Sequence, residues 1–319
     1  TVIGTGGIPM YKKKRGQDYY TNRHSCFLLQ YHLVLVTKYR KPVLKGEVKE
    51  LVYQIIRDIF KPNKQFTIFI HHINHINIID IFVKNNFTII TIGGGDPFQY
   101  NWIKEVIIFA KKSGLFVHVD TNAFMLKEND DNKEFIVNYI DLIGIPFDAW
   151  TENLKDEIRN KKNYYNLIRK KIEWLNSFST ELKINTFMSK RNIYELNQIA
   201  DFILEINPNI WSIYQFCSVN HIDNIKLKYE LNDNLFKSYT NLLLNKFKES
   251  KIKLEIVSSK NREKQYPIVT SDGKIEIFNY HDKKHYYLGN IFSKDIMKKI
   301  EENCQNDKSF RYIDLISAK

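Results

Sequence analysis

The feature that most constrains this chain is a glycine-rich turn, Gly93–Pro97, placed between an apolar run and a helical pattern. The run Phe87–Ile92 before the turn has the composition of a buried strand, and a second apolar run ends in Asp120–Asn122. The order strand, turn, helix, strand predicts a βαβ unit with the turn at the carboxyl end of its first strand. Because glycine has no Cβ, the backbone of this turn can approach a small ligand closely, and Asp96 is placed to receive a ligand amine.

Alternating strand and helix patterns continue toward the C-terminus. The predicted strands are 87–92, 115–120, 140–145, 182–187, 210–216 and 252–257. The predicted helices are 78–84, 100–113, 130–138, 161–176, 192–205, 231–249 and 294–303, with residues 71–77 as a link before the first of them. The alternation predicts an α/β fold with a mostly parallel sheet and right-handed crossovers, either open or bent into a partial barrel. Residues Ser271–Lys274 predict a hairpin turn.

Cysteine usage and hydropathy limit the setting of the protein. Three cysteines, Cys26, Cys217 and Cys304, stand far apart and form no zinc-type or redox-type spacing. This usage predicts a reducing, cytoplasmic location. No stretch has the length and hydropathy of a membrane-spanning helix, so no membrane partner is expected.

The net charge of +12 is concentrated near the N-terminus. Residues 11–45 contain one acidic residue, Asp18, among these basic ones: Lys12, Lys13, Lys14, Arg15, Arg23, Lys38, Arg40, Lys41 and Lys45. A basic segment rich in aromatic residues can contact phosphates and stack on bases. A solvated basic tail is an equal alternative.

A series of short motifs follows a specific order over residues about 86–293. They are Gly93–Pro97, Asp120–Asn122, Ile143–Asp148 with Arg159, Leu182–Thr186 with Lys190 and Asn192, Trp211–Phe216, Ser271–Gly273 and Tyr287–Ile291. In this order they resemble the radical S-adenosylmethionine (SAM) superfamily, and within it the viperin-like and peptide-maturation-like enzymes. The resemblance implies a partial (βα)6 barrel, related to the TIM barrel, that binds SAM.

The same resemblance assigns a cofactor site but no catalytic residue. The set that it implies lies in the turn and at later strand ends: Gly93, Gly94, Gly95, Asp96, Pro97, Asn122, Asp148, Arg159 and Asn185. The turn would line the methionine amine of SAM, whereas Asn122, Arg159 and Asn185 would face its carboxylate and ribose. A zwitterionic amino acid needs acceptors for its amine and a guanidinium for its carboxylate. Turn chemistry for the asparagines and a surface ion pair for Arg159 are the alternatives.

The cysteine pattern departs from this family. Its chemistry needs Cys-x3-Cys-x2-Cys after the first barrel strand, and the three thiolates hold a [4Fe–4S] cluster. No cysteine lies between Cys26 and Cys217. The expected region instead carries His71, His72 and His75, which are candidate ligands for Zn²⁺, Mn²⁺ or Fe²⁺ or belong to a junction without a selected role.

Residues about 13–60 resemble a different family, the IS200/IS605-type single-strand DNA transposases. The resemblance rests on Tyr20–Ser25 and Tyr31–Val43. It implies contact with single-stranded DNA through these basic residues: Lys12, Lys13, Lys14, Arg15, Arg23, Lys38, Arg40 and Lys41. The tyrosine-bearing helix of that family has no visible counterpart in this chain.

These patterns predict a basic N-terminal α+β appendage at 1–64, a junction at 65–85 and a truncated radical SAM-like partial barrel at 86–319. Strand 66–70 is predicted to take the place of the first barrel strand. The expected function is SAM binding at the Gly93–Pro97 turn, with the [4Fe–4S] cluster in doubt. Single-stranded DNA binding and a catalytically inactive fusion product are the alternatives. The substrate stays unassigned, and exposed apolar surface on the appendage would favour a homodimer.

Overall fold

The computed structural model describes residues 20–21, 26–27 and 71–304, apart from residues 95, 160–161, 219–222, 263–266 and 271–272. The chain forms two compact units, Thr1–Phe69 and Ile70–Lys319. In the first unit, β1 (Tyr20–Thr21) pairs antiparallel with β2 (Cys26–Phe27). The basic residues predicted to bind nucleic acid and the predicted strand 66–70 lie outside the described residues.

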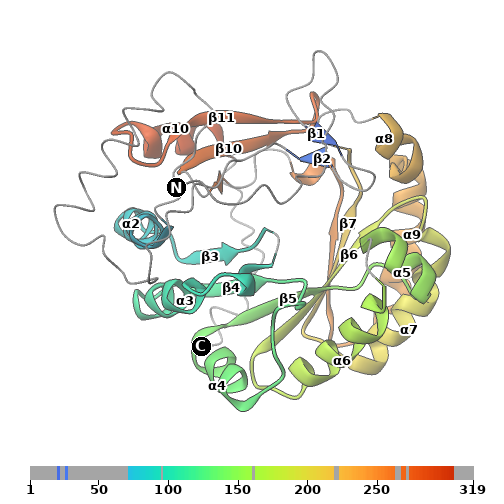
Figure 1. The fold of residues 1–319 in the computed structure, drawn as a ribbon. Helices are drawn as coiled ribbons and strands as arrows, with labels where there is room; N and C mark the ends of the chain where they lie inside the picture. The colour runs from blue at the N-terminus through green and yellow to red at the C-terminus, as the bar shows by residue number, and fades with distance from the viewer. Residues whose placement is uncertain are drawn as a thin grey trace, which may run out of the picture. The chain divides into compact units, whose positions relative to one another are not determined.

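The second unit is built on a sheet of six parallel strands. In sheet order they are β3 (Ile89–Ile92), β4 (Phe116–Asp120), β5 (Leu142–Pro146), β6 (Glu181–Met188), β7 (Ile210–Gln215) and β8 (Lys253–Val257). Figure 1 shows this sheet curled, with helices along its outer side. The predicted parallel sheet is confirmed, and the curl is that of a partial barrel.

Helices connect the strands. They are α3 (Ile103–Lys112), α4 (Asp130–Tyr139), α5 (Glu152–Arg159), α6 (Tyr164–Asn176), α7 (Leu196–Ile206), α8 (Asp223–Tyr229) and α9 (Asp233–Lys246). Short 3-10 turns occur at η1 (Pro97–Gln99), η2 (Ile193–Glu195) and η4 (Lys260–Arg262). The sequence pattern does not predict α5 and α8, because both helices are short and mostly polar.

One apolar core joins the outer face of the sheet to these helices. Val119, Ile145 and Trp211 point outward from β4, β5 and β7 and are fully buried in it. Since successive residues of a strand point to opposite faces, burial of these side chains fixes the strand register and turns the alternate positions to the inner face. Side chains able to bind a ligand therefore lie on the inner face and at the carboxyl edge.

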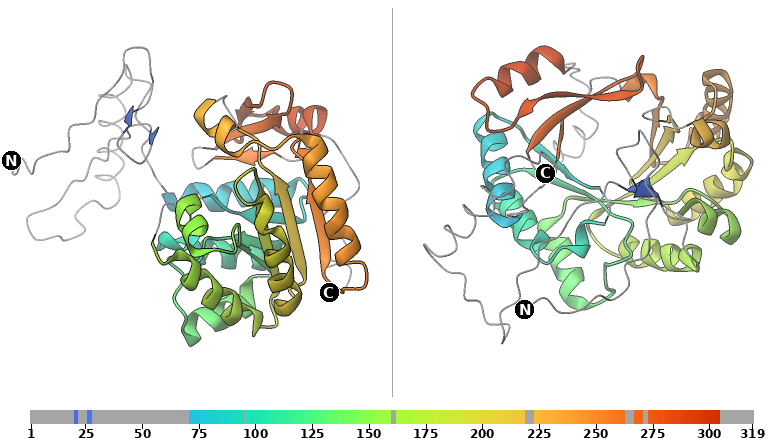
Figure 2. Two further views of the ribbon diagram at one scale, coloured as in Figure 1. Left: turned by 90° about the vertical axis from the view of Figure 1, so that its right-hand side faces the viewer. Right: turned by 45° about the horizontal axis from the view of Figure 1, so that its top comes forward.

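A smaller apolar cluster ties the beginning of the second unit to its end. It joins α2 (His71–Lys84) to a three-stranded antiparallel sheet and α10 (Ile296–Asn303). The sheet has the order β11 (Lys284–Asn290), β10 (Lys274–Asn279), β9 (Ile268–Val269). Ile78 packs with Ile275 and Ile296 in this cluster. The right-hand view of Figure 2 shows the ribbon of α2 next to the antiparallel sheet and α10.

The structure confirms one prediction in this region and corrects another. β9 and β10 pair on either side of residues 270–273, which confirms the predicted hairpin turn. Residues 71–77, predicted as a link, are instead the first half of α2. The His/Asn-rich sequence of this segment obscures the helical spacing of its isoleucines. None of the described helices has both the length and the hydropathy that a membrane crossing would need.

Candidate functional site

The glycine-rich turn follows β3 at the carboxyl edge of the parallel sheet. Gly94 has a φ of +89°, a conformation that residues with a Cβ rarely adopt. A Cβ added to Gly94 would meet nothing within 4 Å, so the space beside this backbone is open. A Cβ on Gly93 would stand 3.5 Å from the Cβ of Asp120 on β4. Gly95 lies outside the described residues.

The Asp96 carboxylate is buried and joins two loops. Its Oδ1 accepts hydrogen bonds from Thr121 Oγ1 at 2.7 Å and from the Phe98 amide at 3.2 Å, and its Oδ2 accepts one from the Met125 amide at 2.8 Å. A carboxylate accepts about four hydrogen bonds, so about one position remains for a ligand amine.

Asn122 lies in the loop that Asp96 holds. Its Oδ1 accepts a hydrogen bond from the Phe124 amide at 3.0 Å, which is the turn chemistry expected of asparagine. Its backbone carbonyl accepts a hydrogen bond from the Tyr164 hydroxyl at 3.0 Å. Burial raises the pKa of Tyr164 to about 12, so this hydroxyl keeps its proton and donates. Ligand contact is left to the Nδ2 group of Asn122.

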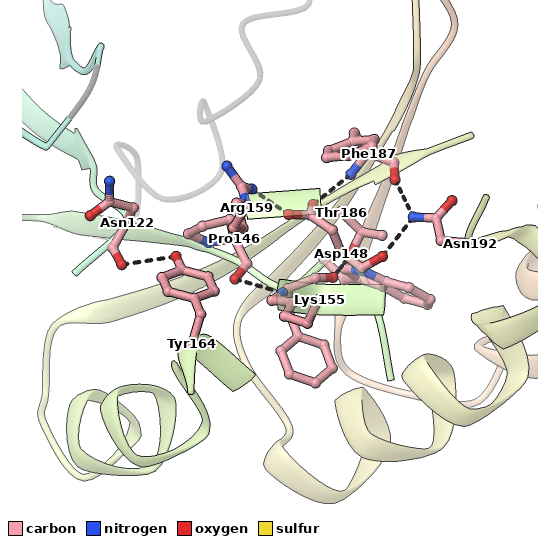
Figure 3. A network of polar contacts seen from close by, with 11 residues as sticks. Asn122, Pro146, Asp148, Lys155, Arg159, Tyr164, Thr186, Phe187 and Asn192 are labelled. Atoms are coloured by element: carbon pink, nitrogen blue, oxygen red, sulfur yellow. Dashed lines mark hydrogen bonds and ion pairs between the residues drawn. The ribbon is translucent and has the colours of Figure 1, made fainter. Parts of the chain in front are cut away.

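Asp148 and Arg159, both in the predicted set, form an ion pair after β5 (Figure 3). Arg159 Nη2 donates to Asp148 Oδ2, while the Phe187 amide donates to Asp148 Oδ1 at 3.1 Å. Asn192 Nδ2 donates to the Asp148 carbonyl at 2.7 Å and to the Phe187 carbonyl at 2.6 Å. The loop after β5 is thereby tied to the end of β6, and the carboxylate is held in one place.

Arg159 retains capacity for a ligand. Its side chain is 32% exposed, and its buried Nε has no hydrogen-bond partner among the described residues. Burial alone would lower the pKa of Arg159, but the adjacent Asp148 carboxylate outweighs it and raises that pKa. The guanidinium therefore stays charged at the carboxyl edge, where it can pair with a second carboxylate.

Lys155 lies beneath this ion pair and is fully buried. Its Nζ is 3.5 Å from the Pro146 carbonyl, 4.5 Å from the centre of the Phe147 ring and 5.9 Å from that of Tyr164 (Figure 3). Burial lowers the pKa of Lys155 to about 7, although the nearby Asp148 acts in the opposite direction. Sequence reasoning does not identify Lys155, because a lysine between acidic residues in a polar helix carries no sign of burial.

Asn185 meets Asp120 across β5. Asn185 Nδ2 donates to Asp120 Oδ1 at 2.7 Å, and Gly144 between them leaves the space for this contact. A Cβ on Gly144 would stand 1.9 Å from Asp120 Oδ1 and 2.9 Å from Asn185 Nδ2. Asn185 Oδ1 is buried without a partner among the described residues, so it is open to a ligand hydroxyl. The sequence predicts Asn185 for the site but not Asp120 as its partner.

The predicted cofactor set thus gathers along one edge of the sheet. Parallel strands end at the same edge, and the residues that follow β3, β4 and β5, with Asn185 near the end of β6, lie there. The candidate metal ligands His71, His72 and His75 are at the start of α2, and their side chains lie outside the described part of the chain. Within that described part, no group of three histidine, cysteine or acidic residues could hold a metal ion.

Two parts of the chain match known families. Residues 73–203 match the Radical SAM superfamily, so the second unit carries a radical SAM domain. Residues 25–88 match the Transposase IS200 like family. Both sequence resemblances are confirmed, and the two matched ranges overlap over most of α2.

The relatives are more specific. The chain is 25% identical over 250 residues to an S-adenosylmethionine-dependent nucleotide dehydratase of Flammeovirga pacifica, covering 74% of this chain and 79% of that protein. It is 33% identical over 138 residues to a protein of the same name from Psychrobacter lutiphocae, covering 41% and 45%.

Solved structures confirm the fold. One is anSMEcpe with bound AdoMet, with a TM-score of 0.58, 14% identity and coverage of 77% of this chain and 75% of that one. Another is Streptococcus suis SuiB bound to S-adenosylmethionine, with a TM-score of 0.52, 15% identity and coverage of 63% and 51%.

The residues fit one of the two groups that this family implies. SAM needs a guanidinium for its carboxylate and open acceptors for its amine and hydroxyls, and Arg159, the glycine turn and Asn185 Oδ1 offer these. The donor set does not fit a [4Fe–4S] cluster. Cys217 follows β7 and Cys304 follows α10, so these thiols do not form the Cys-x3-Cys-x2-Cys group that the cluster needs.

Proposed function

We propose that this protein binds SAM at the carboxyl edge of strands β3–β6. In this assignment Arg159 pairs with the SAM carboxylate and the Gly93–Pro97 turn receives the methionine amine. The Nδ2 group of Asn122 and the Oδ1 atom of Asn185 contact the ribose. SAM supplies a sulfonium-activated adenosyl and methyl donor when bound, and the protein residues named here bind and orient it.

One observation carries the proposal: a charged, partly exposed guanidinium with a free Nε stands at the edge where the glycine turn ends. Asp148 contacts Arg159 through Nη2, so a ligand carboxylate can approach the other nitrogens of the guanidinium. The names of the relatives support the same assignment. Their nucleotide substrates suggest a nucleotide as the second ligand, which extends the proposal to SAM-dependent nucleotide chemistry.

Calorimetric titration of the full chain with SAM tests the proposal. Arg159→Met should lower the affinity for SAM at least about tenfold, because a hydrogen bond to a charged group contributes about 1.5–3 kcal/mol. Arg191→Met is the matched control, because Arg191 pairs with Glu157 on the surface. If Arg159→Met and Arg191→Met bind SAM as tightly as the wild type, the proposal is wrong.

A separate measurement concerns the cluster. Anaerobic reconstitution with iron and sulfide, followed by counting of iron per chain, should fall well short of the four irons of a [4Fe–4S] centre. The physical reason is the wide separation of Cys26, Cys217 and Cys304 in the sequence. Four irons per chain with an EPR signal that shifts on SAM addition would mean that other ligands, near His71–Ile78, replace the thiolates.

A second candidate function has its own support. The Transposase IS200 like match over residues 25–88 and the basic segment at 11–45 favour contact with single-stranded DNA. Binding of a labelled single strand should fall steeply between 50 and 200 mM salt, because phosphate contacts release counterions. It should also be lost when residues 1–45 are deleted. An affinity that does not change with salt would contradict phosphate contact.

A further inference from the structure

The inner face of the curled sheet carries a row of polar residues that the SAM assignment does not use. We name it the inner polar row and define it by six residues: Thr91, His118, Asp120, Lys183, Ser212 and Glu255. Strand register places them on one face, since Thr91 pairs with His118, Asp120 with Gly144, Gly144 with Lys183, and Ser212 with Glu255. The alternate positions of the same strands form the outer apolar core.

The lysine of the row is neutralised within the protein. Lys183 is 1% exposed, and its Nζ lies 3.4 Å from Glu255 Oε2. The Ser212 hydroxyl donates to the same oxygen at 2.5 Å. Because Lys183 is enclosed and already paired, it does not offer a free positive charge to an incoming phosphate.

The other end of the row is acidic and open. Asp120 is 37% exposed, and its Oδ1 lies 3.2 Å from His118 Nε2. Burial would raise the pKa of Asp120, but His118, Lys183 and the Asn185 hydrogen bond lower it to about 2, so the carboxylate is ionised. His118 Nδ1 in turn lies 3.1 Å from the hydroxyl of Thr91, which is exposed.

An unsatisfied acceptor completes the row. The Glu255 side chain is 9% exposed, and its buried Oε1 atom has no hydrogen-bond partner among the described residues. A buried carboxylate oxygen without a donor is unfavourable, so its position indicates a ligand group that donates. The row sets two carboxylates, Asp120 and Glu255, against one lysine and one histidine, so it carries no excess of positive charge.

We propose that the inner polar row receives a nitrogen group of the substrate that donates hydrogen bonds, an ammonium or amidinium, and that it disfavours a polyphosphate. The proposal rests on the proposed function, because the inner face is taken as the substrate side of the SAM site. Asp120 and Glu255 accept from the nitrogen group, and the buried Lys183–Glu255 pair excludes phosphate oxygens by leaving a carboxylate in their path. A nucleotide ligand would then bind with its amino-bearing base, rather than its phosphates, toward this face.

The test is a calorimetric titration of the full chain, with and without SAM, using two kinds of probe. Agmatine presents an ammonium and a guanidinium, and the four ribonucleoside triphosphates present phosphates. Agmatine should bind at least about tenfold more tightly than any triphosphate. Tighter binding of a triphosphate than of agmatine overturns the proposal.

Titration of Glu255→Gln is the more specific test, because this substitution keeps the side-chain shape and removes the charge. Agmatine affinity should fall about tenfold, while triphosphate affinity should rise as Lys183 loses its partner. Asp120→Asn should weaken agmatine as well. Glu173→Gln, an equal charge change on the exposed face of α6, is the matched control and should alter neither ligand.

Failure of this inference and failure of the proposed function give different results. If the wild type does not bind SAM, the proposed function is wrong. If Glu255→Gln has the same affinities for agmatine and for the triphosphates as the wild type, only this inference is wrong. Thermal melting of each variant checks folding. If Glu255→Gln does not fold, Asp120→Asn decides, and unchanged agmatine affinity in this variant contradicts the proposal.

Discussion

The two faces of the parallel sheet differ in what they contain and in how they are held together. On the outer face, Val119, Ile145 and Trp211 are enclosed by apolar side chains of the surrounding helices. On the inner face, Asp120, Asn185 and Glu255 are held by hydrogen bonds and ion pairs between strands. The outer face therefore owes its stability to burial of apolar area. The inner face has a small apolar cluster of Phe116, Leu142 and Ile210, and its polar part is organised by specific pairs that leave a few polar atoms open to ligands.

The largest effect is expected on the outer face. Trp211 is fully buried, its ring centre lies 5.0 Å from that of Phe247, and its Nε1 donates to Thr186 Oγ1 at 3.0 Å. Trp211→Ala should lower the free energy of unfolding by roughly 3–5 kcal/mol, measured by chemical denaturation. Its inner-face neighbour Ser212 donates one hydrogen bond to the Glu255 carboxylate, so Ser212→Ala should cost about 1.5–3 kcal/mol. A larger loss in Ser212→Ala than in Trp211→Ala would reverse the comparison.

A smaller effect is expected from filling the space between the strands of the inner face. Gly144→Ala places a Cβ 1.9 Å from Asp120 Oδ1, so the Asp120–Asn185 pair must separate. We expect a loss of about 1–3 kcal/mol in the free energy of unfolding, as for other overpacked positions. In Gly93→Ala the new Cβ makes only an ordinary contact at 3.5 Å, and its cost should be clearly lower. Equal stabilities for the two variants would show that the inner-face pair contributes nothing to folding.

The pH dependence of stability tests a buried charge at the carboxyl edge, next to the two faces. Lys155 has a pKa of about 7 in the folded protein, against 10.5 for an unperturbed lysine. Below pH 7 it is charged in both states and its burial destabilises the fold. As pH rises from 7 toward 10.5, only the unfolded chain stays protonated, so stability rises by up to about 1.4 kcal/mol per pH unit.

The measurement is the free energy of unfolding between pH 6 and 9. The wild type should gain stability with pH relative to Lys155→Met, because methionine has no charge to bury. Lys170→Met, an exposed lysine of α6, should follow the wild type. Parallel pH profiles for the wild type and Lys155→Met would mean that Lys155 does not titrate in this range.

The smallest effect concerns Asp120. Its folded pKa of about 2 lies below the ordinary value of 3.8, so it contributes stability above pH 4 that is lost as pH falls toward 2. The contribution is reduced because the side chain is partly exposed to solvent. In acid denaturation, Asp120→Asn should therefore show a shallower loss than the wild type between pH 4 and 2. A steeper loss in the variant would contradict the pairing with His118 and Asn185.

The sequence predicts the outer face far better than the inner one. Apolar residues at alternate positions of β4 to β7 carry the signal for the parallel sheet, and the glycine turn after β3 marks its carboxyl edge. Asn122, Arg159 and Asn185 are identified through the family resemblance. Lys155, Asp120 and Glu255 are not, because their roles arise from contacts between distant strands and from burial that a polar sequence does not indicate.

The most direct test of the account is the crystal structure of this chain grown with SAM. We expect the SAM carboxylate on the Arg159 guanidinium and the methionine amine against the Gly93–Pro97 turn, with the inner polar row facing the substrate side. SAM bound elsewhere, or an edge that stays empty at saturating SAM while Arg159 remains closed on Asp148, would contradict it.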